Sequence, residues 1–345
     1  MLSFDETEIT PEFRYLPRMD CVDGFVDMGR HGRTEDVATS VLVFGLRGVN
    51  KRWKQIISYY FMSKAGFDKD LLKKIVEENL EAVFRAGFRV VATVCDGAGI
   101  NRGLATELGV SKTSPMFEFS GNKLAFLFDV PHIIKLIRNH LITKDLLFKS
   151  GNVEGIIKWK DIKHHLEPML TKVLVECPRL TETHLNPLGF SKMRVKLATQ
   201  LFSHSVASSF NYAIARGELP ENPYRLISEF FTQIDKLFDI LNSSSFSHQD
   251  GKPWKTALSM NDENSLFLRS FVDLIENDWL GFIKPTSAGP IINRGVFCLE
   301  MLAQSIRGVL ALSEHLGALG ISRICTRRFN QDILENHFVQ VLHLH

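Results

Sequence analysis

Residues 88–101 read FRVVATVCDGAGIN, and this stretch decides the fold. Phe88–Cys95 is a nearly continuous apolar run, which is typical of a central strand buried on both faces. Asp96 ends the run, and a glycine-rich turn then leads to a short helix expected over Asn101–Leu108. A carboxylate at the end of a buried strand is costly to ionise unless something offsets its lost hydration. Asp96 is therefore a candidate for chemistry, although a helix-capping role also fits.

The segments on either side of this strand predict a sheet with helices between its strands. Apolar residues between Asp68 and Gly87 recur at helical spacing, with Gly87 as the stop. Pro131 suits the first turn of a helix over Ile133–Leu141. The first 150 residues are therefore expected to form an α/β domain. Its other strands are expected at Phe25–Met28, Thr39–Phe44, Gln55–Phe61 and Leu124–Phe128.

From about Asn152 the pattern changes to apolar residues three and four positions apart, which predicts an all-α insertion domain. Ser243–Lys255 is expected to be a polar loop. A long apolar helix over Gly295–Leu319 and a closing helix over Asn330–His345 follow. The expected domains are 1–150, 151–294 and 295–345. The helices of the insertion are expected at Trp159–Val175, Phe190–Phe210, Tyr224–Leu241 and Phe267–Leu274.

The composition is that of a globular protein, with 45% hydrophobic and 23% charged residues. A net charge of +2 gives little evidence for nucleic-acid binding on its own. The five cysteines are scattered and match neither a zinc pattern nor a disulfide framework, so we expect free thiols in a reducing compartment. We find no signal peptide and no apolar run long enough for a membrane span, so we expect a soluble, intracellular protein.

Two carboxylates stand out along the strands, Asp5 near the start of the chain and Asp96. If they lay about 4 Å apart they would repel by roughly 4 kcal/mol at an effective dielectric constant near 20. A bound Mg²⁺ would remove that repulsion, because hard cations take carboxylate oxygens. The closing helix adds Asp332 and Glu335 on one polar side, although such a side is usually only solvated. Gly97–Gly103 misses the dinucleotide-binding spacing by one residue, and no P-loop motif occurs.

The order of the motifs resembles the P-element-type family of DNA transposases, whose vertebrate members are THAP-domain proteins. The resemblance covers nearly the whole chain, and seven motifs in order are far more specific than any one of them. The matching stretches are SFDETEI (3–9), WKQIISYYF (53–61), AGFRVVATVCDGAGIN (86–101), FLFDVPHIIKLIRN (126–139), LTETHLNPLGFSKMRVKLATQLFSHSVA (180–207), FDILNS (238–243) and RRFNQDILENHF (327–338).

This resemblance implies a ribonuclease H-like mixed sheet flanked by helices, with the all-α insertion between the second and third catalytic carboxylates. Carried over by motif, those carboxylates are Asp5, Asp96 and Glu335, which would hold two Mg²⁺ or Mn²⁺ ions for cleavage and strand transfer of DNA phosphodiesters. The DNA partners would be transposon ends and target, the place of action the nucleus, and a homo-oligomer is possible. Asp129 and His132 also match a motif, with a structural role for His132 the stronger expectation.

The insertion of the family binds GTP as a positioning cofactor, which would explain the missing P-loop. By motif, Asp239, Asn242 and Asp332 correspond to guanine and nucleotide contacts. A carboxylate suits guanine because it accepts hydrogen bonds from both N1–H and the exocyclic amine. Lys192 or Lys196 would supply charge to the phosphates, or would simply be solvated helix residues.

The family also carries a zinc-dependent THAP domain, a coiled coil and a helix-turn-helix ahead of the catalytic fold, and we expect none of them in a chain that begins almost on its first catalytic strand. Whether the chain is an active enzyme is therefore open. The alternative is a catalytically silent, domesticated or truncated transposase remnant that binds GTP or a protein. A nucleotide-cofactor oxidoreductase built on the turn at 97–103 is a poor third hypothesis.

Overall fold

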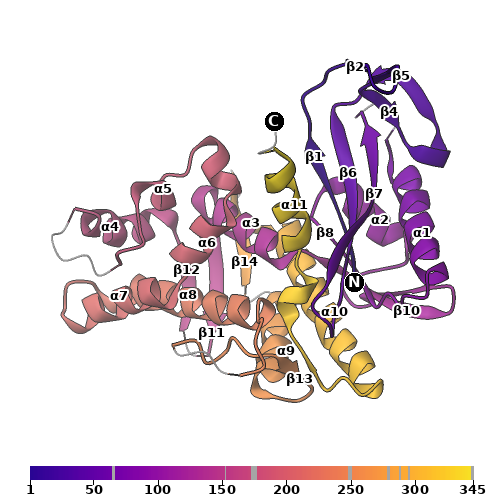
Figure 1. Cartoon of the computed structure of the whole chain (residues 1–345). Helices are drawn as coiled ribbons and strands as arrows, with labels where there is room; N and C mark the ends of the chain where they lie inside the picture. The colour runs from indigo at the N-terminus through magenta and orange to yellow at the C-terminus, as the bar shows by residue number, and fades with distance from the viewer. Residues whose placement is uncertain are drawn as a thin grey trace.

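The structure is a computed structural model that describes residues 1–63, 67–151, 153–171, 177–247, 251–277, 280–286, 289–293 and 296–342. Its centre is an eight-stranded sheet in the order β5-β4-β7-β6-β1-β8-β10-β9 (Figure 1). The strands are β1 (Leu2–Glu8), β4 (Phe25–Asp27), β5 (Arg33–Val37), β6 (Ser40–Arg47), β7 (Lys54–Met62), β8 (Ala92–Cys95), β9 (Met116–Phe119) and β10 (Asn122–Phe128).

The sheet is mixed, because β1 pairs antiparallel with β6 and parallel with β8, which in turn pairs parallel with β10. The carboxyl ends of β1, β8 and β10 therefore meet at one edge. The strand predicted over Phe88–Cys95 is shorter than expected, since β8 holds only its last four residues, all of them buried. The first residue of the predicted strand belongs instead to the end of the preceding helix, because the Phe88 N–H donates a hydrogen bond to the Val83 carbonyl at 3.2 Å.

Helices cover both faces of the sheet, as the alternation of side chains along β7 shows. Tyr60 accepts a hydrogen bond from Asn79 of α1 (Lys69–Arg85), whereas Tyr59 and Phe61 line a cavity with Phe338 of α11 (Asp332–Leu342) on the opposite face. The other helices of this part are α2 (Gly99–Glu107), α3 (Val130–Thr143) and α10 (Phe297–Ala318), with the short η1 (Gly29–His31) and η3 (Thr326–Phe329).

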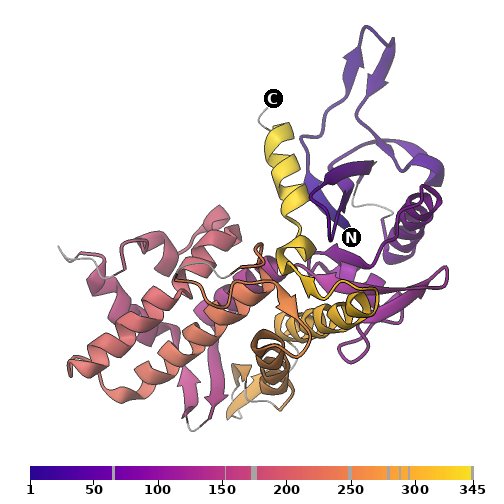
Figure 2. The same ribbon diagram turned by 60° about the horizontal axis from the view of Figure 1, so that its bottom comes forward.

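The middle of the chain forms a block of helices beside the sheet (Figures 1 and 2). Where the chain enters and leaves this block, four strands form a second sheet in the order β12-β11-β14-β15, which the sequence analysis did not predict. The elements are α4 (Trp159–Met169), α5 (Glu182–Leu185), η2 (Gly189–Met193), α6 (Val195–Leu201), α7 (His204–Ala215), α8 (Glu221–Leu241), α9 (Glu263–Glu276), β11 (Asp145–Ser150), β12 (Val153–Ile157), β14 (Leu280–Thr286) and β15 (Gly289–Asn293). Two small ladders pair β2 (Arg14–Leu16) with β3 (Cys21–Asp23) and β13 (Leu258–Ser259) with β16 (Arg323–Ile324).

Most predicted helices are present with shifted ends. The helix predicted over Phe190–Phe210 is divided, because Ser203 adopts an extended conformation (φ −67°, ψ 154°) and α7 starts after it. Parts of four predicted segments fall on residues 172–176, 248–250, 294–295 and 343–345, outside the described residues. Within the described residues, no helix is both long and apolar enough to cross a membrane.

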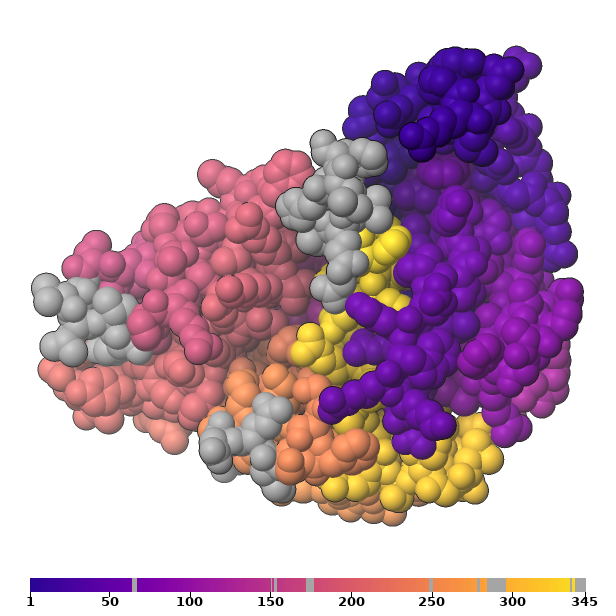
Figure 3. Space-filling view, in the orientation of Figure 1, coloured from indigo at the N-terminus to yellow at the C-terminus, as the bar shows by residue number. Residues whose placement is uncertain are grey.

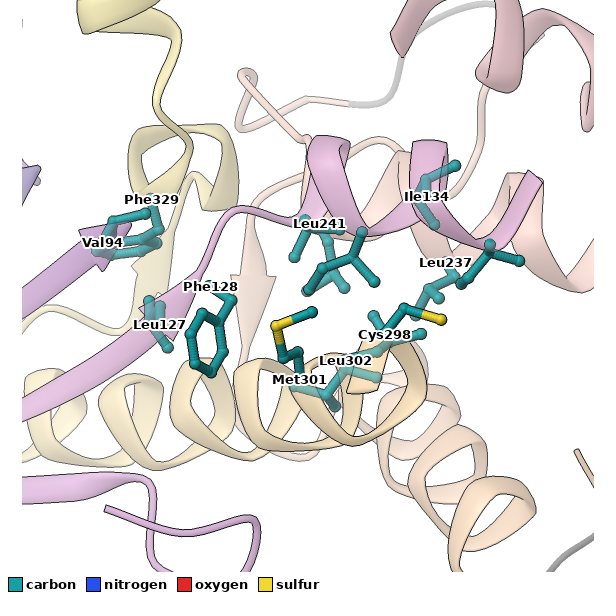
Figure 4. Close-up of a cluster of buried hydrophobic side chains, with 14 of the residues drawn as sticks. Val94, Leu127, Phe128, Ile134, Leu237, Leu241, Cys298, Met301, Leu302 and Phe329 are labelled. Atoms are coloured by element: carbon teal, nitrogen blue, oxygen red, sulfur yellow. The ribbon is translucent and has the colours of Figure 1, made fainter. Parts of the chain in front are cut away.

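The hydrophobic core runs without interruption from the sheet into the insertion (Figure 4). Val94 of β8 and Leu127 of β10 lie at the same end of this cluster as Phe329. Met301 and Leu302 of α10 extend the cluster toward the insertion. Ile134 of α3 and Leu237 and Leu241 of α8 complete it. The insertion is thereby fixed against the end of the sheet where β8 and β10 terminate.

The close approach of α10 to the sheet makes Gly308 a sensitive position. A Cβ there would lie 2.4 Å from the Leu127 side chain, so Gly308→Ala should destabilise the fold by roughly 1–3 kcal/mol through overpacking. In α2, a Cβ at Gly103 would make only ordinary contact with Lys69, so Gly103→Ala should stabilise by up to about 1 kcal/mol. Urea unfolding of the two variants checks the prediction, and an equal effect of both would contradict it.

Candidate active site

The register of the sheet brings three aspartates to one level at the edge of β1, β8 and β10. Ser3 pairs with Val94, and Phe128 pairs with Cys95. Continuing both pairings sets Asp5 beside Asp96 and Asp129 beyond it, and the Asp129 N–H still donates to the Cys95 carbonyl at 2.8 Å. Neighbouring residues in register point to the same face. The strand-end carboxylates therefore share one side of the sheet.

Asp96 is held by the turn that follows it. Its Oδ1 accepts hydrogen bonds from the Ala98 N–H at 3.0 Å and from Asn101 Nδ2 at 2.6 Å. Asp96 does not cap the following helix as the sequence allowed, because the N-cap of α2 is Ala98. The turn between β8 and α2 holds Asp96 instead. It fixes the direction of the carboxylate, while no described residue donates to the second oxygen, which stays available to a ligand.

Asp5 is under electrostatic strain. Burial and, second, the negative charge of Asp96 raise the pKa of the Asp5 carboxyl from its ordinary 3.8 to about 7. His132 lowers this pKa, but not enough to compensate. Two ionised carboxylates at this edge therefore oppose one another, and a cation that both could bind would remove the opposition.

His132 lies between two further carboxylates. Its Nδ1 is 2.9 Å from Asp129 Oδ2, and its Nε2 is 3.5 Å from Glu335 Oε1. Burial acts to lower the pKa of His132, but the Asp129 carboxylate outweighs burial and the pKa is raised. His132 was expected to have a structural role. The structure connects it to the predicted site, because it links the Asp129 side of the sheet edge to Glu335.

Gln331 docks the helix that carries Glu335, and the sequence analysis gave it no such role. Its backbone N–H donates to Asp129 Oδ1 at 2.8 Å, and its side-chain Nε2 donates to the Phe4 carbonyl at 2.7 Å. Leu334 packs on Val43, the β6 partner of Asp5. Helix α11 therefore lies on the face toward which the strand-end carboxylates point, beside β1 in Figures 1 and 2.

These side chains are close but are not arranged as a finished metal site. Among the described residues, no three histidine, cysteine or acidic side chains are grouped so that they could hold a metal ion as they stand. Asp5 and Asp96 are near neighbours, whereas Glu335 contacts His132. The donors are nevertheless those that Mg²⁺ and Mn²⁺ prefer, and 47% of the Glu335 side chain is exposed.

The predicted guanine contacts lie where α8 ends and α11 begins. Asp239 is buried and both of its oxygens accept from Lys252 Nζ, at 2.8 and 3.0 Å. Asn242 accepts a hydrogen bond from Asn330 at 3.0 Å, and Asp332 pairs with Arg327 Nε at 2.7 Å. The structure therefore brings the two motifs together, with each carboxylate already facing a cation.

Among the described residues, the two lysines predicted to bind the phosphates do not line the cavity beside Asp239. A cavity of about 470 Å³ lies beside Asp239 and is lined by Arg179, His204, Phe238 and Lys252, among others. Lys192 and Lys196 are exposed and are absent from the described residues that line it. Arg179 and Lys252 are thus the cations closest to a nucleotide placed there. Lys252 falls in the segment predicted only as a polar loop, so no periodic signal marked it.

Comparison with known proteins shows which family the chain resembles. Residues 1–109 match the family described as "TNP-like, RNase H N-terminal domain", and residues 131–253 match "TNP-like, GTP-binding insertion domain". The "Transposable element P transposase" of Drosophila melanogaster is 29% identical over 98% of this chain, and the human "DNA transposase THAP9" is 26% identical over 67% of it. The chain spans only 41% and 26% of the lengths of these two relatives.

A solved structure agrees with the sequence comparisons. The chain superposes on the "Drosophila P element transposase strand transfer complex" with a TM-score of 0.80 and 27% identity, covering 98% of this chain and 70% of that one. The ribonuclease H-like fold class and the resemblance inferred from the seven motifs are both confirmed.

Proposed function

Because the chain belongs to the P-element-type transposase family, we propose that it is the core of a metal-dependent DNA transposase that cleaves and joins DNA strands. The observation that carries the proposal is the convergence of Asp5 and Asp96 on adjacent strands with the helix that bears Glu335. The proposed partners are transposon ends and target DNA, and the proposed place of action is the nucleus. The proposed domains remain 1–150, 151–294 and 295–345.

Asp5, Asp96 and Glu335 would hold two Mg²⁺ or Mn²⁺ ions. When bound, such ions supply an activated attacking oxygen and stabilise the leaving oxygen of an in-line phosphodiester exchange. The residues of the chain prepare this site. Asn101 orients Asp96, and Gln331 fixes α11 against β1. A rotamer change of Glu335 away from His132 would complete the ligand set.

The direct test is nicking of a supercoiled plasmid by the purified chain. We expect conversion to the nicked form with Mg²⁺ or Mn²⁺ and no conversion with EDTA. Nicking at the same rate in EDTA, or no nicking by a folded protein with either metal, would contradict the proposal.

We further propose that the insertion binds GTP through Asp239, Asn242 and Asp332, with the phosphates toward Arg179 and Lys252 rather than Lys192 or Lys196. In support, Asp239 is buried and lies beside the 470 Å³ cavity, where its carboxylate could exchange Lys252 for the N1–H and amine of guanine. The position of Lys252 would then shift toward the phosphates.

Asp239→Asn should weaken GTP binding by roughly tenfold to a hundredfold, because an amide cannot accept two hydrogen bonds from guanine as a carboxylate does. Calorimetric titration with GTP and with ATP measures the change. The variant should lose its preference for GTP, while Asp161→Asn on α4 should keep it. Unchanged selectivity in Asp239→Asn would remove Asp239 from the site.

The catalytically silent GTP- or protein-binding module remains the second candidate. The ion pair of Glu335 with His132 favours it, since that contact holds Glu335 away from Asp5 and Asp96. GTP binding that depends on Asp239, in a protein that nicks no DNA, would select this candidate over the nuclease.

A further inference from the structure

A second cavity, of about 520 Å³, lies at the C-terminal end of β6. Two segments far apart in the sequence supply its basic residues, and Ser244 after α8 and Asp332 and Ile333 of α11 also line it. One is the end of β6 and the turn into β7, with Arg47, Arg52 and Lys54, and the other is η3, with Arg327 and Arg328. We call the cavity lined by these five basic side chains the arginine cavity. In Figure 3 the yellow C-terminal part of the chain lies beside the violet part.

The arginine cavity is strongly cationic in a chain that is nearly neutral. Its lining has five cations and one carboxylate, Asp332, whereas the whole chain has 41 basic and 39 acidic residues. Asp332 pairs with Arg327. Like charges gathered around one cavity repel one another, and an anion bound there would relieve the repulsion.

Backbone carbonyls hold the guanidinium groups in place. Arg328 Nη1 donates to the Gly48 and Lys51 carbonyls at 2.7 and 2.6 Å, and Arg47 Nη1 donates to the Arg327 carbonyl at 3.1 Å. Each guanidinium carries five N–H donors, so others remain for a ligand. Neutral partners fix the geometry of the cations without cancelling their charge, which is the arrangement that binds a phosphate well.

The arginine cavity is close enough to the carboxylates for one DNA strand to contact both. Val43 pairs with Asp5, and Arg47 lies four residues farther along the same strand, on the same face. At a rise of about 3.3 Å per residue the two are roughly 13 Å apart. Two phosphates of one DNA strand that are a few nucleotides apart span a comparable distance. Phosphates of one strand could therefore lie at both places.

An aromatic side chain forms part of the same wall. Trp53 is 37% exposed and also lines an adjoining, more apolar cavity with Phe88, whose ring centroid is 5.4 Å away. An aromatic ring beside cations is the usual combination in sites that contact sugars and bases next to bound phosphates. A free inorganic anion would make no use of Trp53.

We propose that the arginine cavity binds the phosphodiester backbone of DNA a few nucleotides from the reacting phosphate. This proposal rests on the proposed function for the identity of the anion, but not on cleavage. The cavity shares Asp332 with the proposed GTP contacts, whereas Asp239 and Asn242 are absent from the described residues that line it. The cavity would set the path of the DNA across the face that carries Asp5.

The test uses the double variant Arg52→Gln, Lys54→Gln, whose two side chains are exposed, so the fold should be retained. The matched control is Lys74→Gln, Lys123→Gln, which removes the same charge from exposed positions on α1 and β10. Fluorescence anisotropy with a short labelled duplex, in EDTA and over a series of salt concentrations, gives the Kd for DNA.

We expect the cavity variant to raise the Kd about tenfold, and to reduce the slope of log Kd against log salt by about 1.8, or about 0.9 for each lost phosphate contact. The control should leave both close to wild type. Equal weakening by both variants would overturn the proposal, since net charge alone would then explain binding. It would also be overturned if the cavity variant lost binding of fluorescent GTP while keeping that of DNA.

The two proposals fail separately. If the wild-type chain nicks no DNA in Mg²⁺ but the anisotropy results are as expected, the nuclease proposal fails and the DNA-binding cavity stands. If nicking is present but DNA affinity does not depend on Arg52 and Lys54, the cavity proposal fails alone.

Discussion

Asp96→Asn is expected to reduce Mg²⁺-dependent nicking by about a hundredfold to a thousandfold, the usual effect of removing one preorganised electrostatic contact from an active site. We expect this loss of activity to come from the missing negative charge and not from a change in local structure. Asparagine retains an Oδ1 that can accept from Ala98 and Asn101, so the turn after β8 should keep its shape. What is lost is the negative charge beside Asp5 that a divalent cation requires.

The measurement is the initial rate of plasmid nicking at saturating Mg²⁺. The matched control is Asp262→Asn, because Asp262, like Asp96, accepts a hydrogen bond from a backbone N–H close to the start of a helix. Its partner is the Ser265 N–H at 2.7 Å, and it lies at the start of α9. The control should nick at the wild-type rate. Equal rates for both variants and the wild type would show that Asp96 has only the structural role.

Asp5→Asn is expected to stabilise the metal-free protein by about 2–4 kcal/mol at pH 8. The folded-state pKa of Asp5, about 7, lies above its ordinary value of 3.8, so the folded state binds the proton more tightly than the unfolded state. Stability is therefore lost as the pH rises from about 4 to 7, and the loss is complete above pH 7. Asparagine carries no charge and escapes this loss, so the difference should vanish below about pH 4.

Thermal unfolding with and without Mg²⁺ completes this test. Mg²⁺ should raise the midpoint temperature of unfolding of the wild type at pH 8, because the cation offsets the carboxylate repulsion. It should have little effect on the midpoint temperature of Asp5→Asn. Glu118→Gln, on the exposed side of β9, is the control and should behave as wild type. A wild type more stable than Asp5→Asn at pH 8 without metal would contradict the charge conflict at this edge.

The sequence could predict those parts of the fold that depend on local patterns. The apolar run before Asp96 indicated a buried strand, and the period of apolar residues from Asp68 indicated α1, whose first turn Asp68 caps by accepting from the Leu71 N–H. The motifs identified the family, and the comparisons confirm it. Strand-end carboxylates are visible in a sequence because charge at the end of an apolar run is unusual.

The features that the sequence did not reveal depend on contacts between distant residues. Gln331 contacts Phe4 and Asp129 only because three elements meet, and no spacing in the chain marks it. Likewise, the β11–β14 ladder joins residues about 130 positions apart, and neither strand has a long alternating pattern. The arginine cavity combines residues near 50 with residues near 327, each unremarkable in its own segment.

The assignments of single residues in the candidate site stay predictions. The structure places Asp5, Asp96 and Glu335 around one edge of the sheet but leaves Glu335 in contact with His132. Asp239, Asn242 and Asp332 lie near the meeting point of α8 and α11, whereas Lys192 and Lys196 do not line the neighbouring cavity among the described residues. The metal-binding step is therefore the part of the account that most needs a direct measurement.

Fe²⁺-directed cleavage of the polypeptide, with DNA bound, tests whether the three carboxylates share their cations. Fe²⁺ substitutes for Mg²⁺ at oxygen ligands, and the radicals it generates cut the chain close to the ion. We predict fragments that end near residues 5, 96 and 335, all suppressed together by excess Mg²⁺. Cuts near residues 5 and 96 without any near 335 would contradict the account, because Glu335 would then stand outside the metal site.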